Sequence, residues 1–266
     1  MSRIPKFNTS PQTAKSHGRI PIVPWHPVLG LLFIFFLYYV SQFIGGAAVS
    51  IYPIIKHWTT AQANDWLSSS VTAQFVYILI AEATAIGAIY LFLKRYRTKL
   101  SIIGLRKPRW SDLGYGLLAV IPYYALYLIA QSVISHFVPS LNVNQAQEIG
   151  FTNVNGTLPL VLTFISLVVL PPITEEIMVR GFLYSSLRKA MPLIYAALLT
   201  SFAFAIAHLP EGGASGPLYI AAIDTFVLSM VLIWLREKTG GLWASITLHA
   251  IKNGIAFVAL FILHLA

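Results

Sequence analysis

Three charged side chains, Glu175, Glu176 and Arg180, stand within one apolar run of the sequence. An ionised group near the centre of a bilayer costs about 2.5 to 3.5 kcal/mol on insertion scales, so a charge at such a depth marks a functional site or an internal ion pair. On a helix, Glu176 and Arg180 share a face because they are four residues apart, whereas Glu175 points about 100° away from Glu176. The spacing therefore predicts that Arg180 neutralises Glu176 and leaves Glu175 available for chemistry.

Two imidazoles and an amide stand in other apolar stretches further along the chain. His249 and Asn253 are four residues apart and share one helical face, as do Phe204 and His208. If these helices converge, a carboxylate, two imidazoles and an amide meet in one cavity, and this set suits the activation of water. Counted from the basic helix ends at about 1.5 Å per residue, Glu175 and His249 lie about 20 Å deep but His208 about 28 Å. The depth of His208 thus disagrees with that of the other groups.

The composition of the 266-residue chain is that of a polytopic membrane protein. Hydrophobic residues make up 57% of the sequence and charged residues only 10%. The net charge of +9 does not indicate nucleic-acid binding, because its largest cluster, residues 94–109, lies between two apolar spans. The positive-inside rule and anionic lipid explain a cluster at such a place. The chain has no cysteine, which excludes thiol catalysis, iron–sulfur ligation, disulfides and cysteine-based zinc sites.

Seven apolar stretches predict an all-α transmembrane helical bundle of about seven spans. They cover residues 28–54, 71–93, 113–137, 158–187, 193–208, 218–235 and 242–265. The fourth stretch is 30 residues long, more than the roughly 20 that cross a bilayer, and Pro171 and Pro172 interrupt it. Proline breaks the helical hydrogen bonding, so we expect a kink or two helical pieces there. The total rises to eight spans if this stretch splits.

The distribution of Lys and Arg between the connections predicts the orientation. The N-terminal tail and the connections after the second, fourth and sixth spans are basic, whereas those after the third and fifth contain no Lys or Arg. This alternation places the N-terminus in the cytoplasm and the C-terminus outside. The chain divides into a disordered cytoplasmic tail (1–26), N-terminal transmembrane helices (27–137) and a second membrane region (158–266) that holds all the groups above.

Three motifs follow one another in this second membrane region. They are Glu-Glu-x-x-x-Arg at 175–180, Phe-x-x-x-His at 204–208 and His-x-x-x-Asn at 249–253, and Thr-Gly-Gly-Leu-Trp at 239–243 precedes the last. Each motif alone is weak, but three in this order on apolar segments are a strong signal. With them the chain resembles the CPBP intramembrane endopeptidases, the CAAX prenyl protease and bacteriocin-processing family, also called Abi. The resemblance covers about residues 158–260, and the first 110 or so residues match only as generic spans.

The resemblance implies an intramembrane endopeptidase that acts on a membrane-associated or lipidated peptide or protein. In the family's mechanism, Glu175 and His208 would activate a water molecule, while His249 and Asn253 would stabilise the oxyanion. Residues 158–266 would then be the catalytic region, in a bacterial cell membrane. Its partners would be membrane lipid and a prenylated or bacteriocin-like substrate, and it would not bind nucleic acid. Its role would be bacteriocin processing or self-immunity.

The metal dependence of this chemistry stays open at the level of the sequence. Glu175, His208 and His249 could form a two-histidine, one-carboxylate zinc site with an open position for water, and members of the family are often labelled metalloproteases. On the other side, the chain has no His-Glu-x-x-His motif, and Asn253 fits an oxyanion hole without a metal. A metal-free glutamate mechanism is therefore favoured. In it, Glu176 and Arg180 would be supporting residues of the site.

Three other functions compete with this one. A non-catalytic immunity or scaffold protein could keep the motifs for packing and bind a peptide or a partner helix, although binding would not need all four polar groups. A transporter would use carboxylates such as Glu82 and Asp224 as a proton relay, but no inverted repeat is visible. We expect these two carboxylates to be structural, with Asp224 paired to Arg180 or Lys252. A rhomboid-like serine protease would use Ser215, and then the three motifs stay unexplained.

Overall fold

The computed structural model of the chain describes residues 20–265 and folds them into helices, with no strand in that range. Seven helical segments are long and apolar enough to cross a membrane. Their bounds are Pro27–Ile55, Val71–Arg95, Trp110–Phe137, Thr157–Ala190, Leu193–Ser215, Tyr219–Thr239 and Trp243–Ile262. The predicted all-α transmembrane bundle of seven spans is therefore confirmed.

Three of the spans are single α-helices, and the others are composed of shorter elements. The single helices are α1 (Pro27–Ile55), α3 (Val71–Arg95) and α10 (Tyr219–Thr239). The third span joins α4 (Trp110–Leu118) to α5 (Val120–Phe137), the fifth joins α9 (Leu193–Ala207) to the 3₁₀ turn η4 (Leu209–Ser215), and the seventh joins α11 (Trp243–Phe257) to the π-helical η5 (Val258–Ile262).

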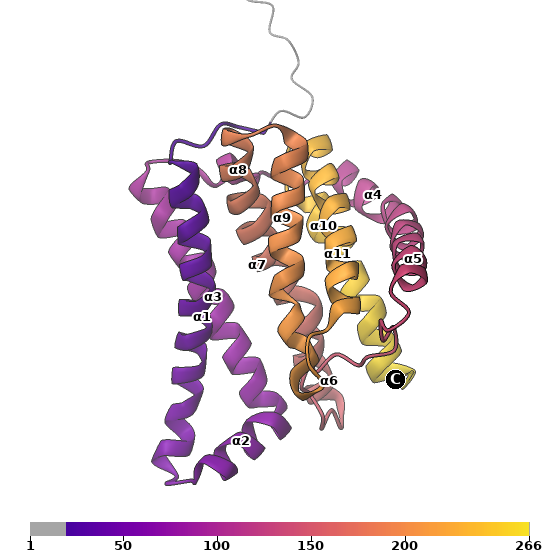
Figure 1. Cartoon of the computed structure of the whole chain (residues 1–266). Coiled ribbons are helices and arrows are strands. Elements are labelled where there is room, and N and C mark those ends of the chain that lie inside the picture. The colour runs from indigo at the N-terminus through magenta and orange to yellow at the C-terminus, as the bar shows by residue number, and fades with distance from the viewer. Residues whose placement is uncertain (1–19, 266) are drawn as a thin grey trace, which may run out of the picture.

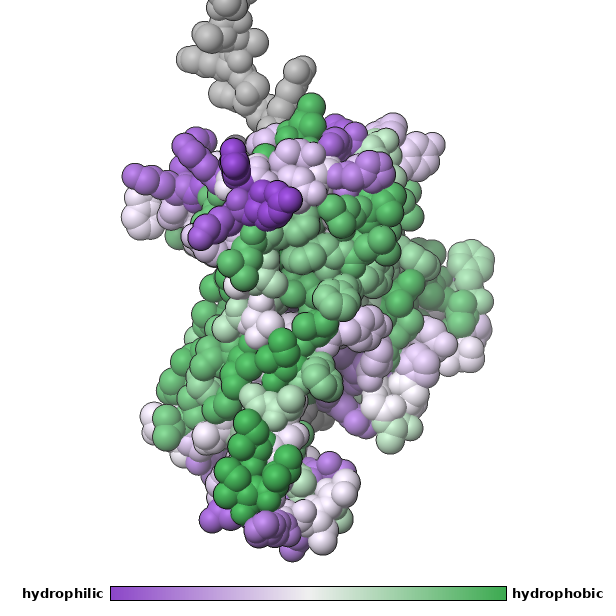
Figure 2. Space-filling view, turned by 90° about the vertical axis from the view of Figure 1, so that its left-hand side faces the viewer, coloured by the Kyte–Doolittle hydropathy of each residue, from purple (hydrophilic) through white to green (hydrophobic). Residues whose placement is uncertain are grey.

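Two helices of the N-terminal region form a pair beside the rest of the bundle (Figure 1). α1 packs along α3, while α10 packs between α9, α5 and α11 in the larger group. Figure 2 shows the face formed by α1 and α3 as an apolar band with hydrophilic side chains at both ends. This pattern is what a bilayer requires, because hydrocarbon cannot hydrate polar groups.

The fourth span runs unbroken through its two prolines. It consists of α6 (Thr157–Phe164), η2 (Ile165–Val169), α7 (Leu170–Glu175), η3 (Glu176–Leu183) and α8 (Tyr184–Ala190), in which η2 and η3 are π-helical. Pro171 and Pro172 follow η2 almost directly, and the helix continues through them although neither proline can donate a backbone hydrogen bond. The predicted interruption is thus absorbed by a wider turn on each side of α7, and the stretch counts as one span rather than two.

Two further segments lie outside the long helices. The connection after α1 contains a short helix, α2 (Thr60–Ser69), which begins with a capping box formed by Thr59 and Gln62. Of the predicted tail, residues 1–19 lie outside the described residues, whereas the segment just before α1 packs on the bundle. There the Trp25 ring stacks on Phe182 at 4.7 Å, and its Nε1 donates to Ser186 Oγ over 2.7 Å.

Candidate active site

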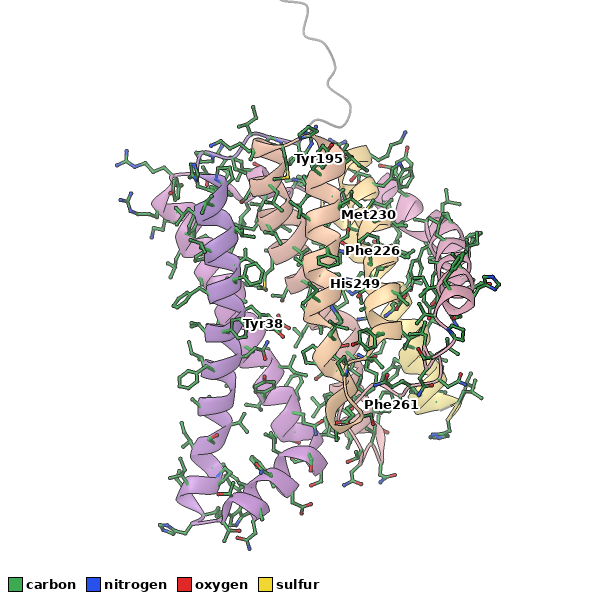
Figure 3. All side chains as sticks on the ribbon, viewed as in Figure 1. Tyr38, Tyr195, Phe226, Met230, His249 and Phe261 are labelled. Atoms are coloured by element: carbon green, nitrogen blue, oxygen red, sulfur yellow. The ribbon has the colours of Figure 1, made fainter. Side chains whose placement is uncertain are left out.

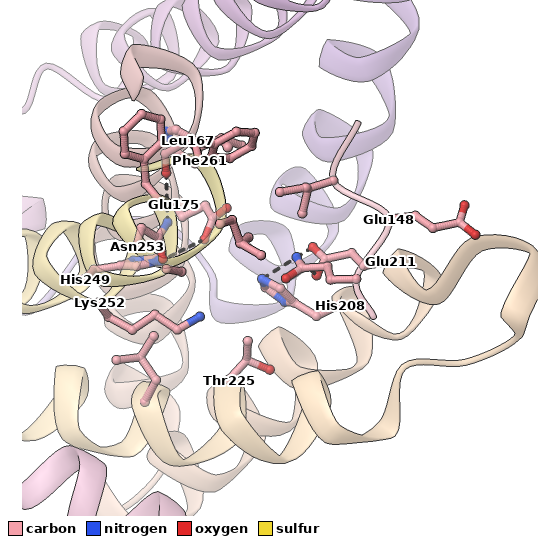
Figure 4. A pocket seen from close by; sticks show the side chains of 17 residues that line it. Glu148, Leu167, Glu175, His208, Glu211, Thr225, His249, Lys252, Asn253 and Phe261 are labelled. Atoms are coloured by element: carbon pink, nitrogen blue, oxygen red, sulfur yellow. Dashed lines mark hydrogen bonds and ion pairs between the residues drawn. The ribbon is translucent and has the colours of Figure 1, made fainter. Parts of the chain in front are cut away.

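The four catalytic candidates of the sequence line one cavity of about 270 Å³ (Figure 4). Glu175 comes from the end of α7, His208 from the C-cap of α9, and His249 and Asn253 from α11. Figure 3 places His249 part-way along the bundle, between the levels of Tyr195 and Phe261. The predicted convergence of the three motifs on one site within the bundle is therefore what the structure shows.

The two adjacent carboxylates have different surroundings, as the helical spacing predicts. Glu176 is fully buried and accepts a hydrogen bond from Arg180 Nη1 at 2.9 Å. Glu175 keeps 31% of its side chain exposed and lines the cavity, with its Oε2 at 3.8 Å from His249 Nε2. Arg180 thus neutralises Glu176, and Glu175 is the carboxylate that faces the cavity.

His249 is held by the same ion pair. Its Nδ1 lies 3.0 Å from Glu176 Oε1, the oxygen that also accepts from Arg180. Because an ionised carboxylate can only accept, His249 Nδ1 carries a hydrogen, and its Nε2 is directed towards Glu175. In the singly protonated ring this Nε2 is an acceptor, and in the doubly protonated ring it is a second donor. Glu176 therefore fixes the orientation of the His249 ring in the cavity.

His208 is oriented by the backbone of its own helix. Its Nδ1 lies 2.7 Å from the carbonyl oxygen of Phe204, which can only accept, so Nδ1 carries the hydrogen. The neutral ring then presents Nε2 as an acceptor, at 3.8 Å from Glu211 Oε1. In this tautomer, His208 Nε2 can accept a hydrogen bond from a water molecule in the cavity.

Phe204 joins the groups that the sequence placed at different depths. The centroid of its ring lies 4.5 Å from that of His208 and 6.2 Å from that of His249, and Arg180 Cζ lies 4.4 Å from it. The predicted disagreement in depth arose because the turn between α8 and α9 was counted as helical rise. Counted from Leu193, where α9 begins, His208 lies about 22 Å deep, close to the other groups.

Asn253 is bonded to the fourth span just before its two prolines. In a regular helix the carbonyl of Leu167 would accept from residue 171, but Pro171 has no N–H to donate. Asn253 Nδ2 donates to this carbonyl instead, over 2.9 Å. A buried carbonyl without a partner costs about 1 to 3 kcal/mol, so this contact ties α11 to the helix that carries Glu175. The second hydrogen of the Asn253 amide takes no part in this bond.

The cavity has further polar residues that the motifs do not include. The connection between α5 and α6 crosses its mouth: Gln147 Nε2 donates to Glu211 Oε2 over 2.7 Å, and the backbone N–H of Glu148 donates to the Glu211 carbonyl over 2.7 Å. Glu148 in turn accepts from the backbone N–H of Ala214 over 3.2 Å. The sequence contained one signal for these residues: Glu211 follows His208 by three residues at the end of a helix, so the two side chains could be expected to lie close together.

A second ion pair lies at the wall of the cavity. Lys252 lines the cavity, and its Nζ lies 3.0 Å from Asp224 Oδ2, while the Tyr123 hydroxyl donates to Asp224 Oδ1. Of the two partners predicted for Asp224, the structure selects Lys252. Glu82 lies on α3 and is not among the residues that line the cavity.

The donors of the cavity do not form a three-ligand metal site. Among residues 20–265, no three side chains of His, Cys, Asp or Glu are grouped as potential ligands of one ion. The Nε2 atoms of His208 and His249 each lie 3.8 Å from the carboxylate oxygen of a different glutamate. A zinc site needs two imidazole nitrogens and a carboxylate oxygen grouped around one centre, each about 2.0 to 2.2 Å from it, and these residues show no such grouping. As placed, Glu175, His208 and His249 thus do not fit the zinc site that the sequence left open.

Comparison with known proteins gives one family. Residues 157–255 match the family described as type II CAAX prenyl endopeptidase Rce1-like, and this range includes all three motifs. No curated protein and no solved structure matches the chain. Residues 157–255 are therefore similar to the type II CAAX prenyl endopeptidases, in agreement with the resemblance that the three motifs carry.

Proposed function

We propose that the protein hydrolyses a peptide bond of a membrane-associated or lipidated peptide or protein, using a water molecule that Glu175 and His208 activate. The observation that carries this proposal is the separation of the two neighbouring carboxylates. Glu176 is occupied by Arg180 and His249, whereas Glu175 faces the cavity across from His208. A purely structural pair of carboxylates would not leave one of them in a cavity beside two imidazoles.

The reaction begins with a water molecule between Glu175 and Nε2 of His208. As the water oxygen attacks the carbonyl carbon of the peptide bond, Glu175 takes its proton and His208 accepts its other hydrogen in a hydrogen bond. The carbonyl oxygen becomes an oxyanion. Glu175 then gives the proton to the amine nitrogen, the C–N bond breaks, and the carboxylate of Glu175 is restored. Proton transfer of this kind contributes typically about 100- to 10,000-fold to a rate.

Two donors are available for the oxyanion. His249, when doubly protonated, donates from Nε2 while Glu176 holds its Nδ1. Asn253 donates one amide hydrogen to Leu167 and has the other for the substrate. One donor in such a site is worth about 100- to 1,000-fold in rate. Asn253 thus has a positioning role through its bond to Leu167 of η2, in addition to the role in the oxyanion hole.

The biological setting is part of the same proposal. The protein would act in a bacterial cell membrane, in bacteriocin processing or self-immunity. Its substrate would be prenylated or bacteriocin-like. A cavity lined by polar groups inside an apolar bundle is compatible with this setting. The chemistry needs no metal ion, because the Glu175 carboxylate supplies the base and Asn253 a neutral donor for the oxyanion.

A cleavage assay with a chelator tests this function. The purified protein in detergent is incubated with a library of quenched fluorescent peptides, with and without lipid groups, before and after treatment with a zinc chelator. We expect cleavage at the same rate in both preparations. If cleavage stops with the chelator and returns when zinc is added, the metal-free mechanism is wrong. If the folded protein cleaves none of the peptides, the proposed activity itself fails.

A further inference from the structure

The cavity of the candidate site is open at one end of the bundle. Its lining residues outside the helical segments come from the connection between α5 and α6, namely Gln147, Glu148 and Ile149, and Glu211 is contributed by η4. Among the described residues, the connections α3–α4, α8–α9 and α10–α11 contribute nothing to the lining. Water and substrate therefore reach the cavity from the end where η4 and the α5–α6 connection lie.

At this end the α5–α6 connection contacts two other parts of the chain. The backbone N–H of Phe151 donates to Gln74 Oε1 over 2.7 Å, and Thr152 Oγ1 donates to the carbonyl of Ser68 over 3.3 Å, so the α5–α6 connection contacts the region between α2 and α3. The same connection is bound to η4 through Glu148. Figure 1 shows this end opposite to the one at which the described chain enters α1. The cavity end is thus defined by three separate parts of the sequence.

Positive charge is concentrated at the opposite end. Of the 18 Lys and Arg in the sequence, 15 precede α1 or lie in or beside the connections α3–α4, α8–α9 and α10–α11. At the cavity end, only Lys56 lies in a connection, and Arg180 and Lys252 are within spans. Connections rich in Lys and Arg stay in the cytoplasm during insertion, whereas Asp and Glu have little influence.

We infer that the cavity opens on the extracytoplasmic side of the membrane. This inference rests on the proposed function in naming a substrate, which is then an exported peptide or an extracytoplasmic segment of a membrane protein. A peptide that stays in the cytoplasm would face the basic connections, where the cavity has no opening. His208 lies beyond the middle of its span, Leu193–Ser215, as counted from the basic end, which agrees with access from outside.

The absence of cysteine makes the orientation directly measurable. Three exposed serines, for which the structure records no side-chain hydrogen bond, can each be replaced by a single cysteine in the full chain: Ser140 and Ser215 at the cavity end and Ser101 at the basic end. These changes leave every charge in place, so they do not alter the signal that sets the orientation. The variants are expressed in cells and treated with a membrane-impermeant maleimide, before and after the cells are opened.

We expect Ser140→Cys and Ser215→Cys to react in intact cells, and Ser101→Cys to react only in opened cells. The reverse pattern would overturn the inference, and so would equal labelling of all three variants in intact cells. Two reporters at the cavity end keep the test valid if one of the variants does not fold.

A second measurement separates this inference from the proposed function. A membrane-impermeant cleavable peptide is added to sealed vesicles of either orientation that contain the wild-type protein. We expect cleavage by right-side-out vesicles and loss of cleavage in inside-out vesicles. Cleavage only by inside-out vesicles would refute the extracytoplasmic opening and leave the peptidase activity intact. With no cleavage in either preparation, the proposed function would fail, while the labelling pattern would still decide the orientation.

Discussion

The variant Glu175→Gln is expected to lower kcat for peptide cleavage by about 100- to 10,000-fold. The amide of glutamine has the shape of the carboxylate but cannot take a proton from water at neutral pH. Folding should be unaffected, because the contact of Glu175 with His249 is as long as 3.8 Å and no arginine depends on it. The measurement is the initial rate of cleavage of a quenched peptide, together with the thermal unfolding of the same preparation in detergent.

A matched variant far from the cavity serves as the control. Glu237 Oε1 accepts from the Tyr184 hydroxyl at 2.7 Å and from Arg188 Nε at 3.2 Å near the basic end, and the amide oxygen of a glutamine can still accept both bonds. Glu237→Gln should therefore cleave at the wild-type rate. An unchanged rate in Glu175→Gln, with the protein folded, would remove Glu175 from the mechanism. An equal loss in both variants would show that the change acts on the fold and not on the reaction.

Replacing either member of the buried pair alone is expected to lower the free energy of unfolding by about 3 to 5 kcal/mol. Arg180 and Glu176 are both completely buried, so removal of one leaves an uncompensated charge inside the bundle. Arg180→Met leaves Glu176 with only His249 as partner, and Glu176→Met leaves Arg180 with the ring of Phe204. The measurement is unfolding in a denaturant series, with the detergent held constant.

The double variant separates the structural from the catalytic role of this pair. Two methionines of similar volume remove both charges, and such replacements of buried pairs are often neutral or stabilising. Stability should therefore recover in the double variant relative to either single variant. Activity should not recover, because His249 Nδ1 has lost its acceptor and the ring is no longer held. A double variant that is as unstable as the single variants would contradict the view that the loss in each single variant comes from the charge left behind.

The features that follow from helical spacing could be predicted from the sequence. Residues four apart share a face, and this rule is enough to assign Arg180 to Glu176 and to place Asn253 beside His249. The seven spans follow from apolar length in the same way, because each crosses the bilayer within a single segment. The similarity of residues 157–255 to the CAAX endopeptidases could also be predicted, since the motifs that carry it are local in the sequence.

The features that depend on contacts between distant segments could not be predicted. The bond of Asn253 to Leu167 joins residues 86 apart and exists only because Pro171 leaves a carbonyl free. The connection over the mouth of the cavity has no periodic pattern, and its bonds to Glu211 arise when η4 folds beside it. The depth of His208 was missed for a simpler reason, since a turn that reverses the chain adds residues but no helical rise.

The most direct test of a water-activating glutamate site is a single turnover in water enriched in heavy oxygen. A cleavable peptide is mixed with excess protein, and the masses of the products and of the intact protein are measured by mass spectrometry. Direct attack by water predicts one heavy oxygen atom in the new carboxylate of the peptide product and no adduct on the protein at any time. An acyl group found on the protein, for example on Ser215, would contradict the account, because the peptide bond would then have been broken by a side chain.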